Sequence, residues 1–182
     1  MKKAEGMNKR KMRFPKAFLL GIIMIFVDQY TKYLAVRFLK PAGSVSLIKG
    51  VLELRYLENR GAAFGMLQNR QWIFVVAACV CLIACSWFGL RLAAENRHPA
   101  IRICLAFLAA GAAGNLIDRV SRGFVVDFIY FSLIRFPIFN VADICVTLST
   151  VSLVILVLFF DRETSAERME TSTQQGSEDG KG

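Results

Sequence analysis

The 182-residue chain is too apolar for an ordinary soluble domain, with 55% hydrophobic residues and a mean hydropathy of +0.45. Its net charge of +9 does not indicate nucleic-acid binding, because seven Lys or Arg residues and one Glu fall within the first 16 positions. A basic cluster beside an apolar segment is typical of the cytoplasmic end of a membrane protein. Length and composition therefore favour a small polytopic membrane protein and leave little chain for a soluble core.

Four apolar segments have about the length needed to cross ~30 Å of hydrocarbon at ~1.5 Å per residue. We predict membrane spans over residues 17–38, 71–90, 99–118 and 141–160. The first segment is followed by charged residues and not by a small-residue cleavage site, so we interpret it as a retained helix and not as a signal peptide. The predicted fold class is membrane all-α: four transmembrane helices, a small extracytoplasmic β segment and a second extracytoplasmic loop.

The segment between the first two spans, residues 40–70, has the alternation of a short β hairpin. In residues 52–56, apolar Leu and Tyr side chains alternate with Glu53 and Arg55, and Lys49-Gly50 is a turn signal just before them. A two-stranded piece is marginally stable by itself. We therefore expect this β segment to rest on the membrane surface or on the helices.

The remaining extramembrane segments follow from the order of the spans. Residues 120–140 form a second outer segment rich in aromatic side chains, which suit the membrane interface. Residues 91–102 form a short connector with three arginines, as expected on the cytoplasmic side. We predict a basic cytoplasmic N-terminus over residues 1–16. Residues 161–182 carry six acidic and three basic residues and are predicted to be a disordered cytoplasmic tail.

With both termini inside, every unusual polar group near the membrane falls on its outer side. These groups are Asp28, Lys32, Asn59-Arg60-Gly61, Asn115, Asp118, Arg119, Asp127 and Asp143. Ionisable side chains at membrane depth are costly, and they tend to be paired and functional. The clustering on one side therefore predicts a site.

Several of these groups have a structural interpretation. Asp28 and Lys32 are spaced i, i+4, so they share a helix face and can form a salt bridge that locks the first span to its neighbours. Asp118 and Arg119 can form an ion pair at a helix end that positions the following loop. Asn115 lies in a helix rich in small residues and can hydrogen-bond to another span.

Asp127 and Asp143 differ, because their sequence neighbours are apolar and no basic residue lies at helical spacing. Two carboxylates in such surroundings can share one proton if they meet. One then activates water while the other, with a raised pKa, acts as an acid. That pair suffices for peptide hydrolysis without a metal or a nucleophile. The residues alone leave open which aspartate carries the proton, and a transport role remains an alternative.

Other function classes fit less well. An ion- or proton-coupled transporter using Asp28 or Asp143 would be expected to have an inverted repeat, and none is visible. A lipid phosphotransferase built on Asp118-Arg119 would need clustered carboxylates to hold metal. A serine protease is disfavoured because His98, the one histidine, lies in the opposite loop. A purely structural membrane protein leaves the polar clustering unexplained.

The five cysteines all fall inside predicted spans, at positions 79, 81, 85, 104 and 145. Cys81 and Cys85 are one helical turn apart, but no histidine lies near enough in the sequence to complete a zinc site. We interpret the cysteines as small packing residues. No metal and no cofactor are expected.

Five short motifs, in order, resemble those of the lipoprotein signal peptidase (signal peptidase II) family over about residues 17–160. They are Asp28-Gln29-Tyr30-Thr31-Lys32, Asn59-Arg60-Gly61-Ala62-Ala63-Phe64, Gly114-Asn115-Leu116-Ile117-Asp118-Arg119, Val125-Val126-Asp127-Phe128 and Phe139-Asn140-Val141-Ala142-Asp143. One departure is Ala110, where the family usually has a second glycine before Gly111. It is a small packing change.

The resemblance implies a membrane aspartic endopeptidase that cleaves exported prolipoproteins just before the cysteine bearing a diacylglyceryl group. Asp127 and Asp143 match the catalytic pair. The positions implied to shape the site and hold the substrate backbone are Asn59, Gly61, Asn115, Arg119 and Asn140. Those implied to be structural are Asp28, Lys32 and Asp118.

The implied location is the bacterial inner (cytoplasmic) membrane, with both termini cytoplasmic and the active site on the extracytoplasmic side. The implied partners are lipidated prolipoproteins and membrane lipid, without nucleic acid. We expect the protein to act as a monomer.

Overall fold

The computed structural model describes residues 16–61, 67–68, 70–94 and 98–158. Its elements, in chain order, are α1 (Lys16–Leu34), η1 (Ala35–Leu39), α2 (Lys40–Ala42), β1 (Ser44–Ile48), β2 (Leu52–Asn59), α3 (Gln71–Ala94), α4 (Pro99–Arg122), β3 (Val125–Phe131) and a last helix, Val141–Leu158. The predicted acidic tail, and the predicted basic N-terminus apart from Lys16, lie outside the described residues.

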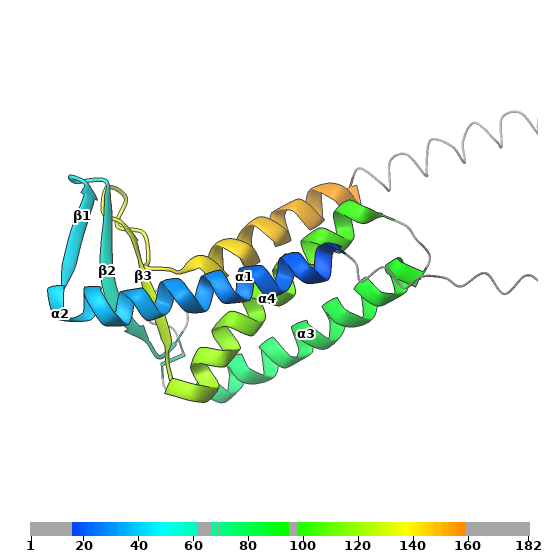
Figure 1. Ribbon diagram of the computed structural model, residues 1–182, viewed down its shortest axis with the longest axis horizontal. Helices are drawn as coiled ribbons and strands as arrows, with labels where there is room; N and C mark the ends of the chain where they lie inside the picture. Colours follow the sequence, from blue (N-terminus) through cyan, green and yellow to red (C-terminus); the bar gives the residue numbers. More distant parts are fainter. Residues whose placement is uncertain (1–15, 62–66, 69, 95–97, 159–182) are drawn as a thin grey trace, which may run out of the picture.

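Within the described ranges, four helices are long and apolar enough to cross a membrane. They are Lys16–Ala42, Gln71–Ala94, Pro99–Arg122 and Val141–Leu158. The helices run side by side, and the strands lie across one end of them (Figure 1). We call this the sheet end of the bundle; α1 begins and the last helix finishes at the far end. Large apolar side chains such as Phe26 and Ile83 point outward, as a lipid solvent requires. The predicted fold class is confirmed.

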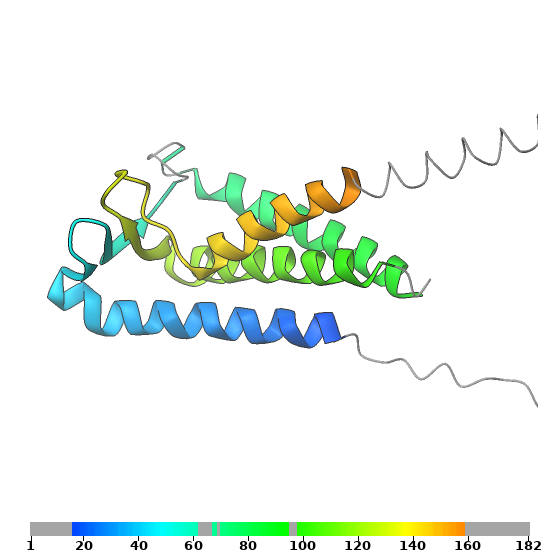
Figure 2. The same ribbon diagram turned by 90° about the horizontal axis from the view of Figure 1, so that it is seen from above.

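Helix α4 organises the bundle, because α1 and α3 both pack against it (Figure 2). Close approach depends on its glycines. A Cβ atom at Gly111 would lie 2.5 Å from the carbonyl oxygen of Ala142 and 2.7 Å from a methyl carbon of Val146. One at Gly114 would lie 2.5 Å from a carboxylate oxygen of Asp28. The small residues predicted to permit close helix packing do so.

Gly111→Ala should therefore destabilise the bundle, because the added methyl group meets backbone that cannot rotate away. Overpacking of this kind costs about 1–3 kcal/mol. Thermal melting in detergent measures the effect. Gly89→Ala is the matched control: its Cβ would have no heavy atom within 4 Å, and helical Gly is less favourable than Ala. A Gly111→Ala protein that melts like the wild type would contradict the packing described here.

The strands form one antiparallel sheet in the order β1-β2-β3. The turn between β1 and β2 places Gly50 at φ +73°, a backbone conformation that favours glycine. The hairpin was predicted, but the third strand was not. β3 comes from the second outer segment, where its sequence VVDFIYF was interpreted only as an interfacial aromatic stretch. Pairing with β2 turns a marginal hairpin into a three-stranded sheet.

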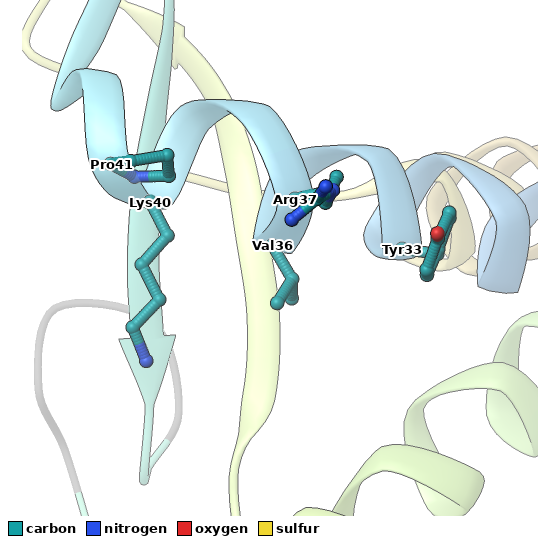
Figure 3. Close-up of a pocket in the computed structure, with 5 residues that line it drawn as sticks. All are labelled: Tyr33, Val36, Arg37, Lys40 and Pro41. Atoms are coloured by element: carbon teal, nitrogen blue, oxygen red, sulfur yellow. The ribbon is translucent and has the colours of Figure 1, made fainter.

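The sheet is anchored on the sheet-end part of the first membrane helix. Ala35 and Leu39 of the π-helical turn η1 form a buried apolar cluster with Val126 and Phe128 of β3. On the helix surface nearby, a shallow cavity of about 420 Å³ is lined by Tyr33, Val36, Arg37, Lys40 and Pro41 (Figure 3).

Lys40 belongs to that surface and reaches back to the sheet. Its ammonium group lies 2.9 Å from Glu58 Oε1 on β2, and about half of the Lys40 side chain is exposed. An exposed pair of this kind contributes little to stability. The buried cluster, and not this ion pair, therefore holds the sheet in place.

Candidate active site

The predicted polar residues come together at the sheet end from five different elements. Asp28 and Lys32 lie on α1, Asn59 ends β2 with Gly61 just after it, Asn115, Asp118 and Arg119 lie near the end of α4, Asp127 lies within β3, and Asn140 and Asp143 lie at the start of the last helix. Five of these side chains are fully buried, those of Asp28, Lys32, Asp118, Asp127 and Asn140, and the side chain of Asp143 is half-buried. Residues 62–64 of the second motif lie outside the described part of the chain.

Asn140 connects the two aspartates. Its side-chain amide donates to Asp127 Oδ1 at 2.6 Å, and its backbone N–H donates to Asp143 Oδ2 at 3.1 Å. The backbone N–H of Asp143 in turn donates to Asn140 Oδ1 at 3.0 Å. This reciprocal pattern is a capping box at the N-terminus of the last helix. One residue therefore caps a helix and holds both carboxylates.

Asn59 holds the other oxygen of Asp127. Its Nδ2 donates to Asp127 Oδ2 at 2.8 Å, and its Oδ1 accepts the backbone N–H of Gly61 at 2.9 Å. Because Oδ1 is occupied by a donor, the amide nitrogen must face the carboxylate. The turn after β2 thus orients Asn59 toward Asp127.

Asn115 performs the same task for Asp143. Its Nδ2 donates to Asp143 Oδ1 at 2.8 Å. Its Oδ1 accepts from Lys32 Nζ at 2.9 Å and from Asn140 Nδ2 at 3.2 Å. The expectation that Asn115 would hydrogen-bond to another span is confirmed.

Lys32 is the centre of a buried charge network, with 0% of its side chain exposed. Its ammonium lies 2.9 Å from Asp28 Oδ2 and 3.1 Å from Asp118 Oδ2. Asp28 also accepts the backbone N–H of Ala142, and Asp118 accepts that of Val126. Asp28 therefore binds the backbone N–H of the residue directly before Asp143, and Asp118 binds that of the residue directly before Asp127.

The ion pair predicted between Asp118 and Arg119 is replaced by other contacts. Successive residues point to different faces of a helix: Asp118 turns inward to Lys32. Arg119 instead donates to the carbonyl oxygen of Gly61 at 3.3 Å and places its guanidinium 4.7 Å from the centre of the Phe74 ring. Phe74 was not identified from the sequence, because an aromatic residue in an apolar span carries no distinctive signal.

The electrostatic state of Asp127 is unusual. Its pKa is raised to about 7, mainly by burial and further by the negative charge of Asp143, against the hydrogen bonds from Asn59 and Asn140. A carboxyl group with a pKa near neutrality can serve as a general acid at physiological pH.

Metal ligation has no support among the described residues. They contain no group of three or more His, Cys, Asp or Glu side chains placed to hold an ion. The five cysteines are free thiols on the helices. His98 is the N-cap residue of α4, and α4 begins at the end of the bundle opposite β3, the strand that carries Asp127 (Figure 1).

The chain is similar to known proteins in both sequence and fold. Residues 20–159 match the family model for signal peptidase (SPase) II. The chain is 42% identical over 144 residues to a lipoprotein signal peptidase of Brevibacillus brevis, covering 79% of this chain and 95% of the relative. It is 42% identical over 147 residues to one from Clostridioides difficile, covering 80% and 97%.

A solved bacterial membrane enzyme, determined by the in meso method at 2.3 Å resolution, has the same fold with a TM-score of 0.70. It is 31% identical, over 79% of this chain and 87% of that chain. The family resemblance read from the five motifs is confirmed. Since both the family model and these relatives cover most of the sequence, the chain belongs to the signal peptidase II family of membrane proteases.

Proposed function

We propose that this protein is an aspartic endopeptidase that removes the signal peptide from diacylglyceryl-modified prolipoproteins, cutting just before the lipidated cysteine. The observation that carries the proposal is the sharing of Asn140 by Asp127 and Asp143. Two carboxyl groups held by one residue, Asp127 by its side-chain amide and Asp143 by its backbone N–H, form the acid–base pair that hydrolysis without metal requires.

In the proposed mechanism, Asp127 carries the proton and Asp143 is ionised. The raised pKa of Asp127 supports its role as acid. Asp143 lies in the first turn of the last helix, where backbone N–H groups and the helix dipole favour a negative charge. Asp143 takes a proton from water as the water oxygen attacks the scissile carbonyl. Asp127 protonates the carbonyl oxygen to give a gem-diol. Asp143 then gives its proton to the nitrogen of the lipidated cysteine as the C–N bond breaks, and Asp127 takes back a proton from a gem-diol hydroxyl group.

The surrounding amides then have specific tasks. Asn59, Asn115 and Asn140 orient the carboxylates through the hydrogen bonds described above. Arg119 and Gly61, which contact each other beside the pair, are proposed to hold the substrate backbone. Orientation of this kind lowers the barrier, because a misplacement of about 1 Å can cost a hundredfold in rate.

The direct test is cleavage by the purified, detergent-solubilised protein. A diacylglyceryl-modified prolipoprotein should be cut before its cysteine, and the same protein with that cysteine replaced by Ala should not. Activity should survive a chelator and a thiol-alkylating reagent, since the pair needs neither metal nor thiol. Loss of activity with chelator and recovery with a divalent ion would contradict the proposal.

The pH dependence of cleavage should reflect Asp127. The protonated form of Asp127 is lost as pH rises through about 7. The rate constant kcat/KM should therefore fall up to tenfold per pH unit above that value. Because Asp127 and Asp143 interact, the observed pKa belongs to the pair. The folded state binds an extra proton between the ordinary pKa of 3.8 and about 7, so stability should also fall as pH rises across that window. A rate that keeps rising beyond about pH 8 would contradict the assignment of Asp127 as acid.

We further propose that the sheet end faces the outside of a bacterial cell membrane and that both termini are cytoplasmic. The N-terminal basic cluster supports this orientation, and α1 begins at the same end of the bundle at which the last helix finishes. The diacylglyceryl group of an exported substrate then lies in the leaflet nearest the aspartates.

Reporters that are active on only one side of the membrane, fused after residues 65, 96 and 170, should show position 65 outside and the other two inside. A cytoplasmic position 65 would overturn the proposed orientation.

A further inference from the structure

A groove runs between α1 and α3 at the far end of the bundle, away from the aspartates. Both helices pack on α4, whose alanines form its floor. The cavity holds about 330 Å³ and is almost entirely apolar, with lining residues that include Gly21, Gly89, Ala106, Ala109, Ala113 and Arg102. Its size falls within the range of ~300–1,000 Å³ typical of small-molecule sites.

The groove lies on the opposite face of α4 from the candidate active site. Ala106 lines the groove, and Asn115 contacts Asp143. Ala106 and Asn115 are nine positions apart along α4. At ~100° per residue, nine steps make two and a half turns, so the two side chains point about 180° apart. A substrate positioned at Asp127 and Asp143 therefore lies across α4 from this groove.

The shape also favours a thin occupant. A helix with its side chains is ~10 Å wide, whereas this groove lies between two helices that both pack on α4. From Arg102 to Ala113 the groove extends ~16 Å along α4, close to the ~15 Å thickness of one hydrocarbon leaflet. These dimensions suit one acyl chain.

The end of the groove nearest the start of α4 is positively charged. Arg102 lines it. Lys16 directly precedes the lining residue Ala17 on α1, and Arg91 directly follows the lining residue Leu90 on α3. The first turns of α1 and α4 contain no acidic residue. Basic pockets between transmembrane helices are typical binding sites for anionic lipid head groups, and a guanidinium can bind a phosphate through two hydrogen bonds.

We propose that this groove binds an anionic phospholipid, with one acyl chain between α1 and α3 and the phosphate on Arg102. The proposal is independent of the peptidase chemistry, because none of the groove residues contributes to the network around Asp127 and Asp143. The lipid would fill a gap that separates two helices and would brace both against α4.

The experiment is native mass spectrometry and thermal melting of the purified full chain in detergent, titrated with phosphatidylglycerol or with phosphatidylcholine of the same acyl chains. One phosphatidylglycerol should be retained per chain, more tightly than phosphatidylcholine, and should raise the melting temperature. Arg102→Gln should weaken phosphatidylglycerol binding about fivefold or more, since one basic residue near a membrane surface contributes on that order. Arg37→Gln, the same charge change at the sheet end, should not.

Occupancy of the groove itself is tested by filling it. Gly89 lines the groove, and a Cβ there meets no heavy atom within 4 Å. The ring of Gly89→Phe is therefore expected to occupy the groove and to abolish retention. Gly89→Leu is a smaller version, and Ile83→Phe, on the outward surface of α3, is the control that should retain lipid. Equal binding of the two lipids, or unchanged binding in folded Gly89→Phe and Gly89→Leu proteins, would overturn the proposal. Cross-linking of a signal peptide to the groove in place of lipid would also overturn it.

Discussion

Replacing either Asp127 or Asp143 by Asn is expected to lower prolipoprotein cleavage by about 10²–10⁴-fold or more. The mechanism needs one carboxylate and one carboxylic acid at the same moment, and an amide can be neither. The double variant should be scarcely slower than either single variant, because residues that act as a unit are strongly non-additive. Both single variants should fold, since each replaces a carboxyl group by a neutral amide of nearly the same shape and adds no charge to the site.

Glu58→Gln provides the matched control for these variants. It makes the same chemical change on the neighbouring strand β2, but Glu58 is partly exposed and pairs with Lys40. Its cleavage rate should stay near that of the wild type. The comparison requires equal amounts of folded protein, established by thermal melting. Near-normal cleavage by folded Asp127→Asn or Asp143→Asn protein would refute the aspartic mechanism.

Lys32→Met should damage both the fold and the activity. It leaves the buried carboxylate of Asp28 without its cation, and that of Asp118 with only the more distant Arg122, 3.7 Å away. Removing one partner of a buried ion pair typically costs about 3–5 kcal/mol. Activity should fall as well, because Asn115 loses the shorter of the two hydrogen bonds that fix its carbonyl oxygen. Thermal melting and cleavage rate are measured together.

Two further variants separate the charge effect from the orientation effect. Lys40→Met removes a cation at the same 2.9 Å from its partner, but in an exposed pair; such pairs contribute about 0–1 kcal/mol, so the melting temperature should barely change. The triple variant Asp28→Asn, Lys32→Met, Asp118→Asn removes both buried carboxylates together with their shared cation. It should melt higher than Lys32→Met while remaining poorly active. A Lys32→Met protein as stable as Lys40→Met would contradict the role given to the network.

Much of the architecture could be predicted because a bilayer imposes simple rules on sequence. Uncharged segments of sufficient length identified the spanning helices, and alternation around Lys49-Gly50 identified the β1–β2 hairpin. The third strand escaped prediction because β3 is buried along most of its length and lacks the alternation of a one-sided strand. Its partner β2 is more than sixty residues earlier in the chain, and local patterns carry no information about that pairing.

The sequence predicted which residues form the site better than it predicted the contacts between them. Asp28 and Lys32 at i, i+4 indicated a salt bridge, which the structure contains. The sequence could not indicate that Lys32 also reaches Asp118 and Asn115, because those contacts depend on how α1 packs against α4. Likewise, the spacing Asn-x-x-Asp occurs twice in the sequence, at Asn115/Asp118 and at Asn140/Asp143. Only the pair Asn140/Asp143 caps a helix, and the spacing alone does not distinguish the two.

The central claim, that Asp127 and Asp143 activate water directly, is tested most directly by single-turnover cleavage in ¹⁸O-labelled water. With enzyme in excess over a diacylglyceryl-modified prolipoprotein, peptide mass spectrometry locates the label. The mechanism predicts one ¹⁸O atom in the new carboxylate of the released signal peptide and none in the side chains of Asp127 or Asp143. Label incorporated into either aspartate would reveal a covalent acyl intermediate and contradict the general acid–base mechanism.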